Sequence, residues 1–186
     1  LGDYHADGDR VFKRLSTFRT QQPARVHDAL PSSYRSPYPA GEPDLTFGAV
    51  KVYVLAVNES VGAPVADING KSMVLLVKHG SFMAVLPGDA DGEVQQLAVK
   101  HAKAMGLPLD QVTLLLGAHH GSGTYGSNNK AWASAVQPQV MVYSAGRDVN
   151  TPELKMHNGH PYHTVVSRFD ALPSMRGAAK HGLFQG

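Results

Sequence analysis

The chain has 186 residues, of which 42% are hydrophobic and 17% charged, and it contains no cysteine. This composition is ordinary for a globular protein, and the length favours one domain with a well-buried core. Without thiols, the sequence excludes disulfides, cysteine nucleophiles and thiolate-bound zinc. A formal net charge of +2 does not by itself indicate binding to nucleic acid or membranes. No apolar run approaches the roughly 18 residues needed to span a bilayer, so no membrane segment is expected.

The first half of the chain predicts one helix followed by strands. Apolar residues at helical spacing favour a helix over residues 10–22, and residues 31–43 are rich in Pro, Ser and Tyr, which is typical of a loop. A β-branched run then predicts a strand over 49–56. Two further strands, joined by a tight turn at His79-Gly80-Ser81, are predicted over 73–78 and 82–86.

The second half of the chain predicts alternating helices and strands. In chain order these are a helix over 91–105, a strand over 112–116, a helix over 128–136 with Ser127 as its cap, a strand over 140–143 and a helix over 162–172. Hairpins followed by helix–strand alternation are typical of an α/β sandwich.

Two of the predicted strands end in side chains that suit a metal site. One strand ends in Leu-Pro-Gly before Asp89, and the strand over 112–116 leads into His119-His120. Loops at strand ends of α/β folds commonly collect ligands, and neutral imidazole is a good metal ligand. Because adjacent strands lie only ~5 Å apart, we expect Asp89 and one of the two histidines to converge on one site.

Each of these residues also has a structural alternative. Asp89 could simply cap the helix that begins near residue 91. In an extended chain His119 and His120 would point to opposite sides. One of them would then face the metal site, and the other could orient a ligand from behind it. Free backbone amides around Gly121-Ser122 would form either an anion-binding nest or a mobile turn. Ser122 does not lie in a Gly-x-Ser-x-Gly elbow, which disfavours a serine hydrolase.

A third polar segment, Asn158-Gly159-His160-Pro161, precedes the last predicted helix. Pro161 holds His160 in an extended conformation and suits the first turn of a helix. His160 belongs either to an ordinary loop or to the metal site, where it would bind or protonate an oxyanion. His157 and His163 are expected at the surface.

In this order and spacing the motifs resemble the metallo-β-lactamase superfamily. Within it they look most like the hydrolase domain of the ComEC-type competence proteins and its stand-alone relatives. The resemblance extends over about residues 12–172. The segments that carry it are Asp44 to Leu55, Ser72 to Leu75, Leu86-Pro87-Gly88-Asp89, His119-His120-Gly121-Ser122, Ser144-Ala145-Gly146 and Gly159-His160-Pro161.

The resemblance implies an αββα sandwich and a metal-dependent hydrolase, a phosphodiesterase or nuclease, that uses two divalent ions, zinc or manganese. Asp89 would bridge the two ions, and His119 or His120 would bind the second ion. His160 and Ser122 would serve catalysis by stabilising an oxyanion. The residues expected to contact substrate are Gly121, Ser122 and Asn69; Asn69 belongs to the segment where many superfamily members place a metal-binding histidine.

The sequence lacks the His-x-His-x-Asp-His motif that supplies most ligands of the family's first metal. We therefore expect residues 1–186 to form the C-terminal part of a single such domain, without its N-terminal half. Two ligands are fewer than a catalytic zinc needs. The expected partners are that N-terminal half or a second copy of the chain, and DNA or another phosphodiester as substrate. The alternative is a non-catalytic binding or assembly domain that kept the fold and lost the metal cluster.

Overall fold

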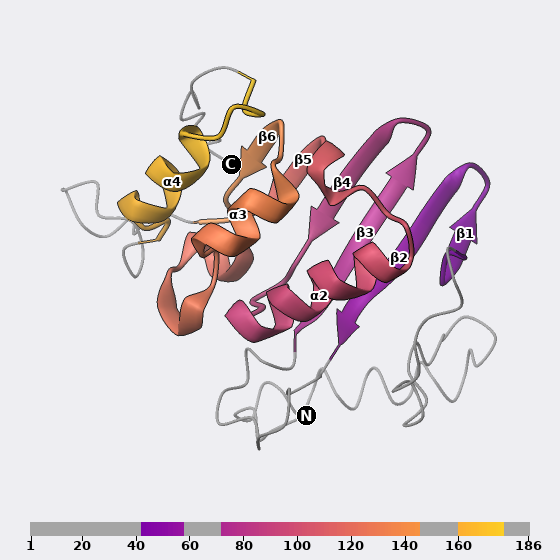
Figure 1. The fold of residues 1–186 in the computed structure, drawn as a ribbon, viewed down its shortest axis with the longest axis horizontal. Coiled ribbons are helices and arrows are strands. Elements are labelled where there is room, and N and C mark those ends of the chain that lie inside the picture. The colour runs from indigo at the N-terminus through magenta and orange to yellow at the C-terminus, as the bar shows by residue number, and fades with distance from the viewer. Residues whose placement is uncertain (1–41, 58–71, 146–159, 177–186) are drawn as a thin grey trace. The chain divides into compact units, whose positions relative to one another are not determined.

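A six-stranded sheet organises the part of the chain that the computed structural model describes, residues 42–57, 72–145 and 160–176 (Figure 1). These ranges belong to one compact unit, residues 37–186. The strands lie side by side in chain order: β1 (Leu45–Phe47), β2 (Val50–Val57), β3 (Met73–His79), β4 (Phe82–Leu86), β5 (Leu114–Leu116) and β6 (Val140–Val142). Pairing is antiparallel from β1 to β4 and parallel from β4 to β6.

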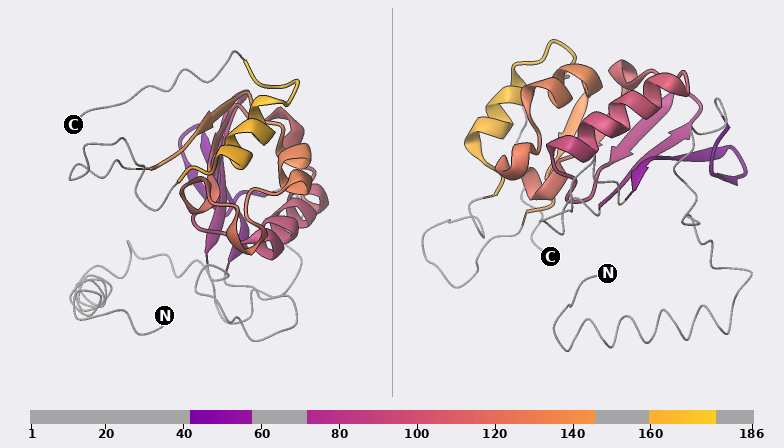
Figure 2. Two further views of the ribbon diagram at one scale, coloured as in Figure 1. Left: turned by 90° about the vertical axis from the view of Figure 1, so that its left-hand side faces the viewer. Right: turned by 60° about the horizontal axis from the view of Figure 1, so that its bottom comes forward.

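The three α-helices of the described residues lie on one face of this sheet, the face that the left view of Figure 2 shows covered. They are α2 (Gly92–Ala104), α3 (Lys130–Val136) and α4 (His163–Asp170). The first two are the crossover connections that parallel strands require, from β4 to β5 and from β5 to β6. Short 3-10 turns complete the loops: η3 (Leu109–Gln111), η4 (Ala118–Gly121) and η5 (Thr124–Gly126).

The core lies between the sheet and the helices. Alternate strand residues point toward the helices and are fully buried, among them Leu76, Val85 and Leu115. Trp132 of α3 and Phe169 of α4 supply the largest buried side chains. Burial of this apolar area is the main stabilising contribution to the fold.

The opposite face of the sheet is also apolar but is more exposed. No described helix covers it (Figure 2). Met73, Phe82, Val140 and Val142, from three different strands, are each about 40% exposed, with values of 38%, 43%, 44% and 41%. Such a face is unusual for a sheet that meets only water.

The predicted α/β class is confirmed, and the described strands and helices match their predictions to within about two residues at most ends. One predicted cap is wrong. The Ser127 hydroxyl donates a hydrogen bond to the Ala90 carbonyl at 2.9 Å, and Asn129 caps α3 by accepting from the Trp132 amide at 2.9 Å. The helix predicted over 10–22 and most of the loop predicted over 31–43 lie outside the described residues. Within the described part of the chain, no helix is both long enough and apolar enough to cross a membrane.

Candidate metal site

The candidate site lies at the edge of the sheet where the parallel strands end. Asp89 follows β4, His119 and His120 follow β5, and Ser144 follows β6. Because these strands run in the same direction, their carboxyl ends meet at one edge. This edge is where open α/β sheets commonly bind ligands.

Asp89 and His120 approach each other as predicted. The His120 Nε2 atom lies 3.8 Å from the Asp89 Oδ1 atom, and both side chains are about half exposed. On its other side, the His120 Nδ1 atom lies 2.6 Å from the Ser144 carbonyl oxygen. A carbonyl oxygen only accepts, so Nδ1 carries the hydrogen, and in the neutral form of the ring Nε2, the atom that faces Asp89, is the one with the lone pair. A histidine whose other nitrogen donates to a carbonyl is the usual arrangement of a metal ligand.

The Asp89–His120 pair fits two positions of a divalent metal site. Their 3.8 Å separation is too long for a hydrogen bond. Two ligands bound about 2.0–2.1 Å from a tetrahedral zinc lie about 3.4 Å apart, so a small side-chain adjustment would accommodate the ion. Among the residues that the structure describes, however, no group of three or more His, Asp or Glu side chains is arranged to hold a metal ion. The described residues therefore offer two neighbouring side chains of ligand type, fewer than a catalytic metal site needs.

The capping alternative for Asp89 is wrong. Asp91 caps α2, because its Oδ1 atom accepts hydrogen bonds from the Glu93 and Val94 amides at 3.0 and 2.9 Å. The Asp89 amide donates instead to the Ser72 hydroxyl at 3.1 Å. This leaves the Asp89 carboxylate turned toward His120 rather than toward the helix.

The expectation of an extended chain at His119-His120 is also wrong. His119 has φ 48° and His120 has φ 56°, so both residues adopt the left-handed conformation that non-glycine residues rarely occupy. Each such residue costs about 1–2 kcal/mol. The bend brings the two rings to a centroid distance of 6.4 Å and places the His119 ring 5.8 Å from the His160 ring. The three imidazole rings thus form a row from His120, the neighbour of Asp89, through His119 to His160.

The surroundings of His160 favour the neutral form of its ring. Its ring stacks on Tyr162 at a centroid distance of 5.0 Å. Burial lowers the pKa of His160 below its ordinary value, the neighbouring His119 and His120 lower it further, and Asp89 partly opposes them. The Nδ1 atoms of His119 and His160 are buried and have no hydrogen-bond partner among the described residues. Because buried polar atoms are seldom unpaired, a bound ion, water or ligand at this place would satisfy them.

Ser122 differs from the sequence interpretation, whereas the substrate-binding role of Gly121 stays a prediction. Ser122 is fully buried, and its hydroxyl is 2.7 Å from the Thr124 hydroxyl and accepts from the Thr124 amide at 3.1 Å. The Ser122 amide donates to the His119 carbonyl at 2.8 Å, so the expectation of a free amide there is wrong. The catalytic and substrate-binding roles of Ser122 stay predictions, and these bonds favour a structural role.

Sequence reasoning missed Tyr143, which packs between two glycines. A Cβ added at Gly117 or Gly121 would lie 2.5 or 2.6 Å from the Tyr143 Cδ1 atom, so only glycine allows the ring to approach. At Gly121 the same Cβ would also lie 2.5 Å from the Pro161 Cβ. Burial raises the pKa of the Tyr143 phenol. The two glycines flanking the histidine pair were the sequence signal for this close packing.

Pro161 precedes α4 rather than occupying its first turn, because Tyr162 is the residue before the helix. The side chain of His163 is exposed, as expected. Asn69 and His157 lie outside the described residues, so their predicted places stay predictions.

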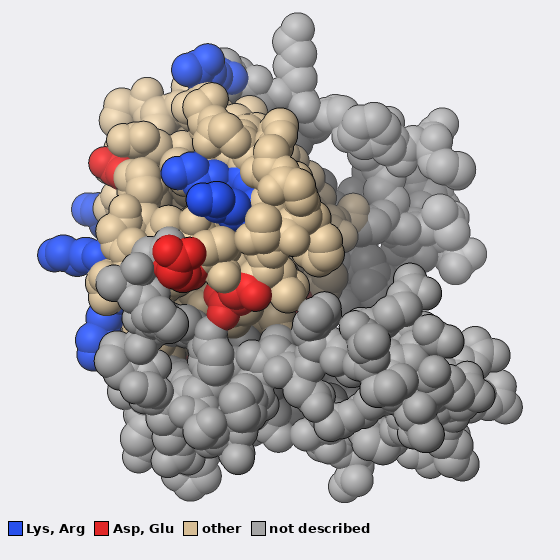
Figure 3. Space-filling view, turned by 90° about the vertical axis from the view of Figure 1, so that its right-hand side faces the viewer, with Lys and Arg blue, Asp and Glu red and all other residues tan. Residues whose placement is uncertain are grey.

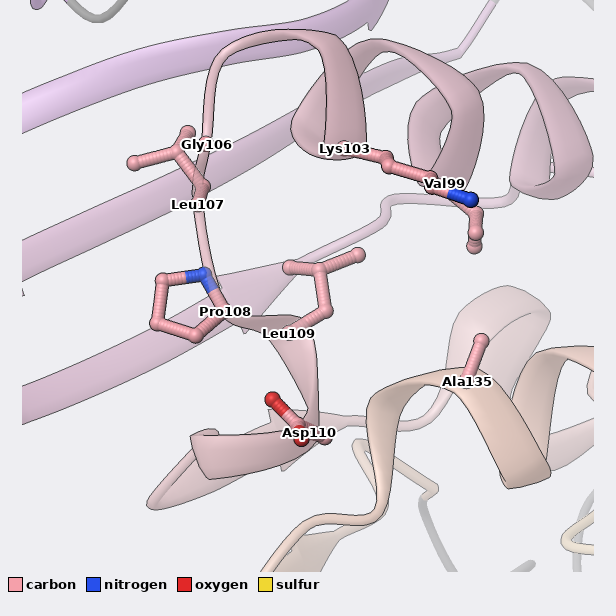
Figure 4. Close-up of a pocket in the computed structure, with 8 residues that line it drawn as sticks. All are labelled: Val99, Lys103, Gly106, Leu107, Pro108, Leu109, Asp110 and Ala135. Carbon is pink, nitrogen blue, oxygen red and sulfur yellow. The ribbon is translucent and has the colours of Figure 1, made fainter.

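Two other surface features lie away from this site. A pocket of about 370 Å³ opens between the C-terminal end of α2, η3 and α3 (Figure 4). Its lining is mostly apolar, with Lys103 and Asp110 as charged members. Since α2 has 13 residues and is about 20 Å long, this pocket is far from Asp89, which lies at the other end of the helix. On the described surface of the face in Figure 3, Lys and Arg side chains are scattered among acidic ones rather than gathered into one broad basic area.

Comparison with known proteins adds no family to this description. No protein-family model matches the sequence, and no curated protein matches it. The chemistry of the chain is therefore argued from the residues and their geometry.

Proposed function

We propose that this chain is part of a metal-dependent hydrolase of the ComEC-type branch of the metallo-β-lactamase superfamily, with a phosphodiester, such as DNA, as substrate. The observation that supports this most is the Asp89–His120 pair: a carboxylate and an oriented imidazole 3.8 Å apart at the carboxyl edge of a parallel sheet. The choice of a phosphodiester over other esters or lactams rests on the motif resemblance alone.

The chain's own residues have distinct roles in this proposal. Asp89 and His120 would hold one divalent ion, zinc or manganese, and Asp89 would bridge to a second ion with ligands outside the described residues. When bound, such ions make water nucleophilic at neutral pH and stabilise charge on phosphoryl oxygens. His160 is neutral at pH 7 and would donate a hydrogen bond to the developing oxyanion or accept a proton. Burial first, and then the neighbouring His119, whose ring lies 5.8 Å away, lower the pKa of His160 and favour its neutral form.

The open sheet face supports the proposal that the complete domain is an αββα sandwich. Sheets that pack face to face bury their inner apolar faces about 10 Å apart. The exposed face here carries Met73, Phe82, Val140 and Val142, which suit burial of that kind. The N-terminal half of the same domain, or a second copy of the chain, would supply the cover. Light scattering of the 186-residue protein should then show association that Val142→Lys reduces; a monomer at high concentration would contradict this part of the proposal.

Metal titration of the 186-residue protein tests the proposal directly. With two ligands, we expect weak binding of Mn²⁺ or Zn²⁺ by calorimetry and little or no hydrolysis of a phosphodiester. Asp89→Asn and His120→Gln should each abolish the measurable binding. The control is His79→Gln, an exposed histidine at the opposite end of the sheet, which should leave binding unchanged. Equal binding by all four proteins would contradict the proposed site and favour the non-catalytic binding domain.

A further inference from the structure

Three buried polar side chains lie directly behind the candidate metal site. Gln95 and Asn128 are 0% exposed and Ser127 is 1% exposed. Burying polar groups is unfavourable unless they are hydrogen-bonded, so the partners of these three residues identify what they stabilise.

Asn128 clamps both ends of the turn that carries the two histidines. Its Oδ1 atom accepts from the Ala118 amide at 3.1 Å. Its Nδ2 atom donates to the carbonyls of Ala118 and Ser122, each at 2.7 Å. One side chain therefore bonds three backbone groups, two on Ala118 before the histidine pair and one on Ser122 after it. Because both histidines hold an unfavourable left-handed conformation, the turn needs such outside support.

Gln95 and Ser127 join this clamp to the turn that carries Asp89. The Gln95 Oε1 atom accepts from the Asn128 amide at 3.0 Å, and its Nε2 atom donates to the Ala90 carbonyl at 3.0 Å. The Ser127 hydroxyl donates to the same carbonyl at 2.9 Å. Ala90 directly follows Asp89, so both candidate ligands are held by one connected set of hydrogen bonds.

The two ligand-bearing turns also contact each other directly. The His119 amide donates to the Gly88 carbonyl at 3.0 Å. Two connections thus fix the main chain of Asp89 relative to that of His120. One runs through the buried side chains of Gln95 and Asn128, and the other is this direct bond between the two turns. A connected, fully bonded network of this kind is rigid.

We propose that Gln95, Ser127 and Asn128 position Asp89 against His120 and so set the affinity of this pair for a divalent cation. The positioning itself follows from the hydrogen bonds; only its effect on cation affinity rests on the proposed function. Partners that orient metal ligands typically change metal affinity 10–100-fold when they are removed. A loss of this size is expected here.

The test compares Asn128→Asp with Asn129→Ala in the 186-residue protein. Aspartate tolerates the left-handed conformation of Asn128 (φ 52°) and keeps the Oδ1 acceptor but lacks the two amide donors. Asn129→Ala removes the neighbouring asparagine, whose side chain caps α3 and whose two hydrogen bonds go to Trp132 and Gly126. Both variants should lower the melting temperature. A change that appears only in Asn128→Asp therefore reports a change in the position of the histidine turn and not a general loss of stability.

The first readout is the tautomer of His120, measured by long-range ¹H–¹⁵N NMR without metal. The wild type and Asn129→Ala should show the hydrogen on Nδ1, bonded to the Ser144 carbonyl, whereas Asn128→Asp should show a mixture of both tautomers. The second readout is the dissociation constant for Mn²⁺, which should rise 10–100-fold in Asn128→Asp only. An unchanged tautomer in folded Asn128→Asp would overturn the positioning role.

If Asn128→Asp does not fold, Gln95→Met answers the same question, because it removes both Gln95 bonds and keeps an unbranched side chain of similar length. The expected and contradicting results are the same as for Asn128→Asp. A wild-type protein that shows the Nδ1 tautomer but binds no Mn²⁺ would contradict the metal function and the affinity effect, while the tautomer comparison would still decide the positioning role.

Discussion

The two ends of the sheet form their turns in different ways. At the hairpin end, the turns between β1 and β2 and between β3 and β4 use Gly48 and Gly80 at positive φ, and no atom of the described residues beyond the chain neighbours lies within 4 Å of a Cβ added at either. At the carboxyl edge, four non-glycine residues adopt positive φ within ten positions: His119, His120, Tyr125 and Asn128.

This difference separates a turn that only reverses the chain from a turn that presents side chains. Glycine adopts left-handed conformations without steric cost, so the hairpin end is unstrained. At the carboxyl edge, each non-glycine residue in the left-handed conformation lowers the stability of the fold by about 1–2 kcal/mol. Such strain persists where the surrounding structure enforces it, commonly at functional sites. Here the enforcing contacts are the Asn128 clamp and the close packing of Tyr143 on Gly121.

The largest expected effect is that of Gly121→Ala. The added Cβ would lie 2.5 Å from the Pro161 Cβ and 2.6 Å from the Tyr143 ring, at a backbone φ of 87°. We expect a loss of about 2–4 kcal/mol in the free energy of unfolding, measured with urea. The matched control is Gly80→Ala, which adds strain but no clash and should cost about 1 kcal/mol. Equal losses at the two glycines would remove the contrast between the two ends of the sheet.

A smaller effect on the free energy of unfolding is expected at the histidines, where a glycine variant should be more stable than an alanine variant. His120→Gly should be more stable than His120→Ala by about 1–2 kcal/mol, because glycine relieves the left-handed strain. In the strand residue His79 the order should reverse, with His79→Gly less stable than His79→Ala by up to about 1 kcal/mol. Chemical denaturation of the four variants measures both differences. The same sign at both positions would contradict the assigned backbone strain at His120.

The smallest expected effect is a dependence of stability on pH through His160. Its pKa is lowered in the folded state, so below its ordinary value of 6.5 the unfolded chain binds the proton more readily. Stability should therefore fall as the pH drops below about 6.5 and recover above it. His160→Gln should remove part of this slope, whereas the exposed His163→Gln keeps it. Melting temperatures between pH 5 and pH 7 give the comparison, and an unaltered slope in His160→Gln would argue against the burial of this ring.

The regular elements followed from local sequence. The helix over 91–105 and the hairpin around Gly80 were predictable because apolar spacing and a turn glycine lie within the element itself. The meeting of Asp89 with a histidine was predictable for a similar reason, since parallel strands end at one edge.

The supporting parts of the site depend on distant residues. Gln95 and Asn128 are 33 residues apart and meet only in the folded chain, so no local pattern marks them. The left-handed conformation of His119 and His120 contradicts the ordinary preference of histidine, and Asn128 bonds the backbone on both sides of it. Sequence reasoning therefore found the two side chains that meet, Asp89 and His120, and misjudged the backbone of the turn that carries the histidines.

The central claim is that Asp89 and His120 form a cation site, and NMR during a Zn²⁺ titration tests it most directly. The account predicts that the His120 Nε2 and Asp89 carboxylate resonances shift together, while those of the exposed His79 and His163 do not, and that Asp89→Asn removes the His120 shift. Equal shifts at all exposed histidines, or a His120 shift that persists in Asp89→Asn, would contradict it.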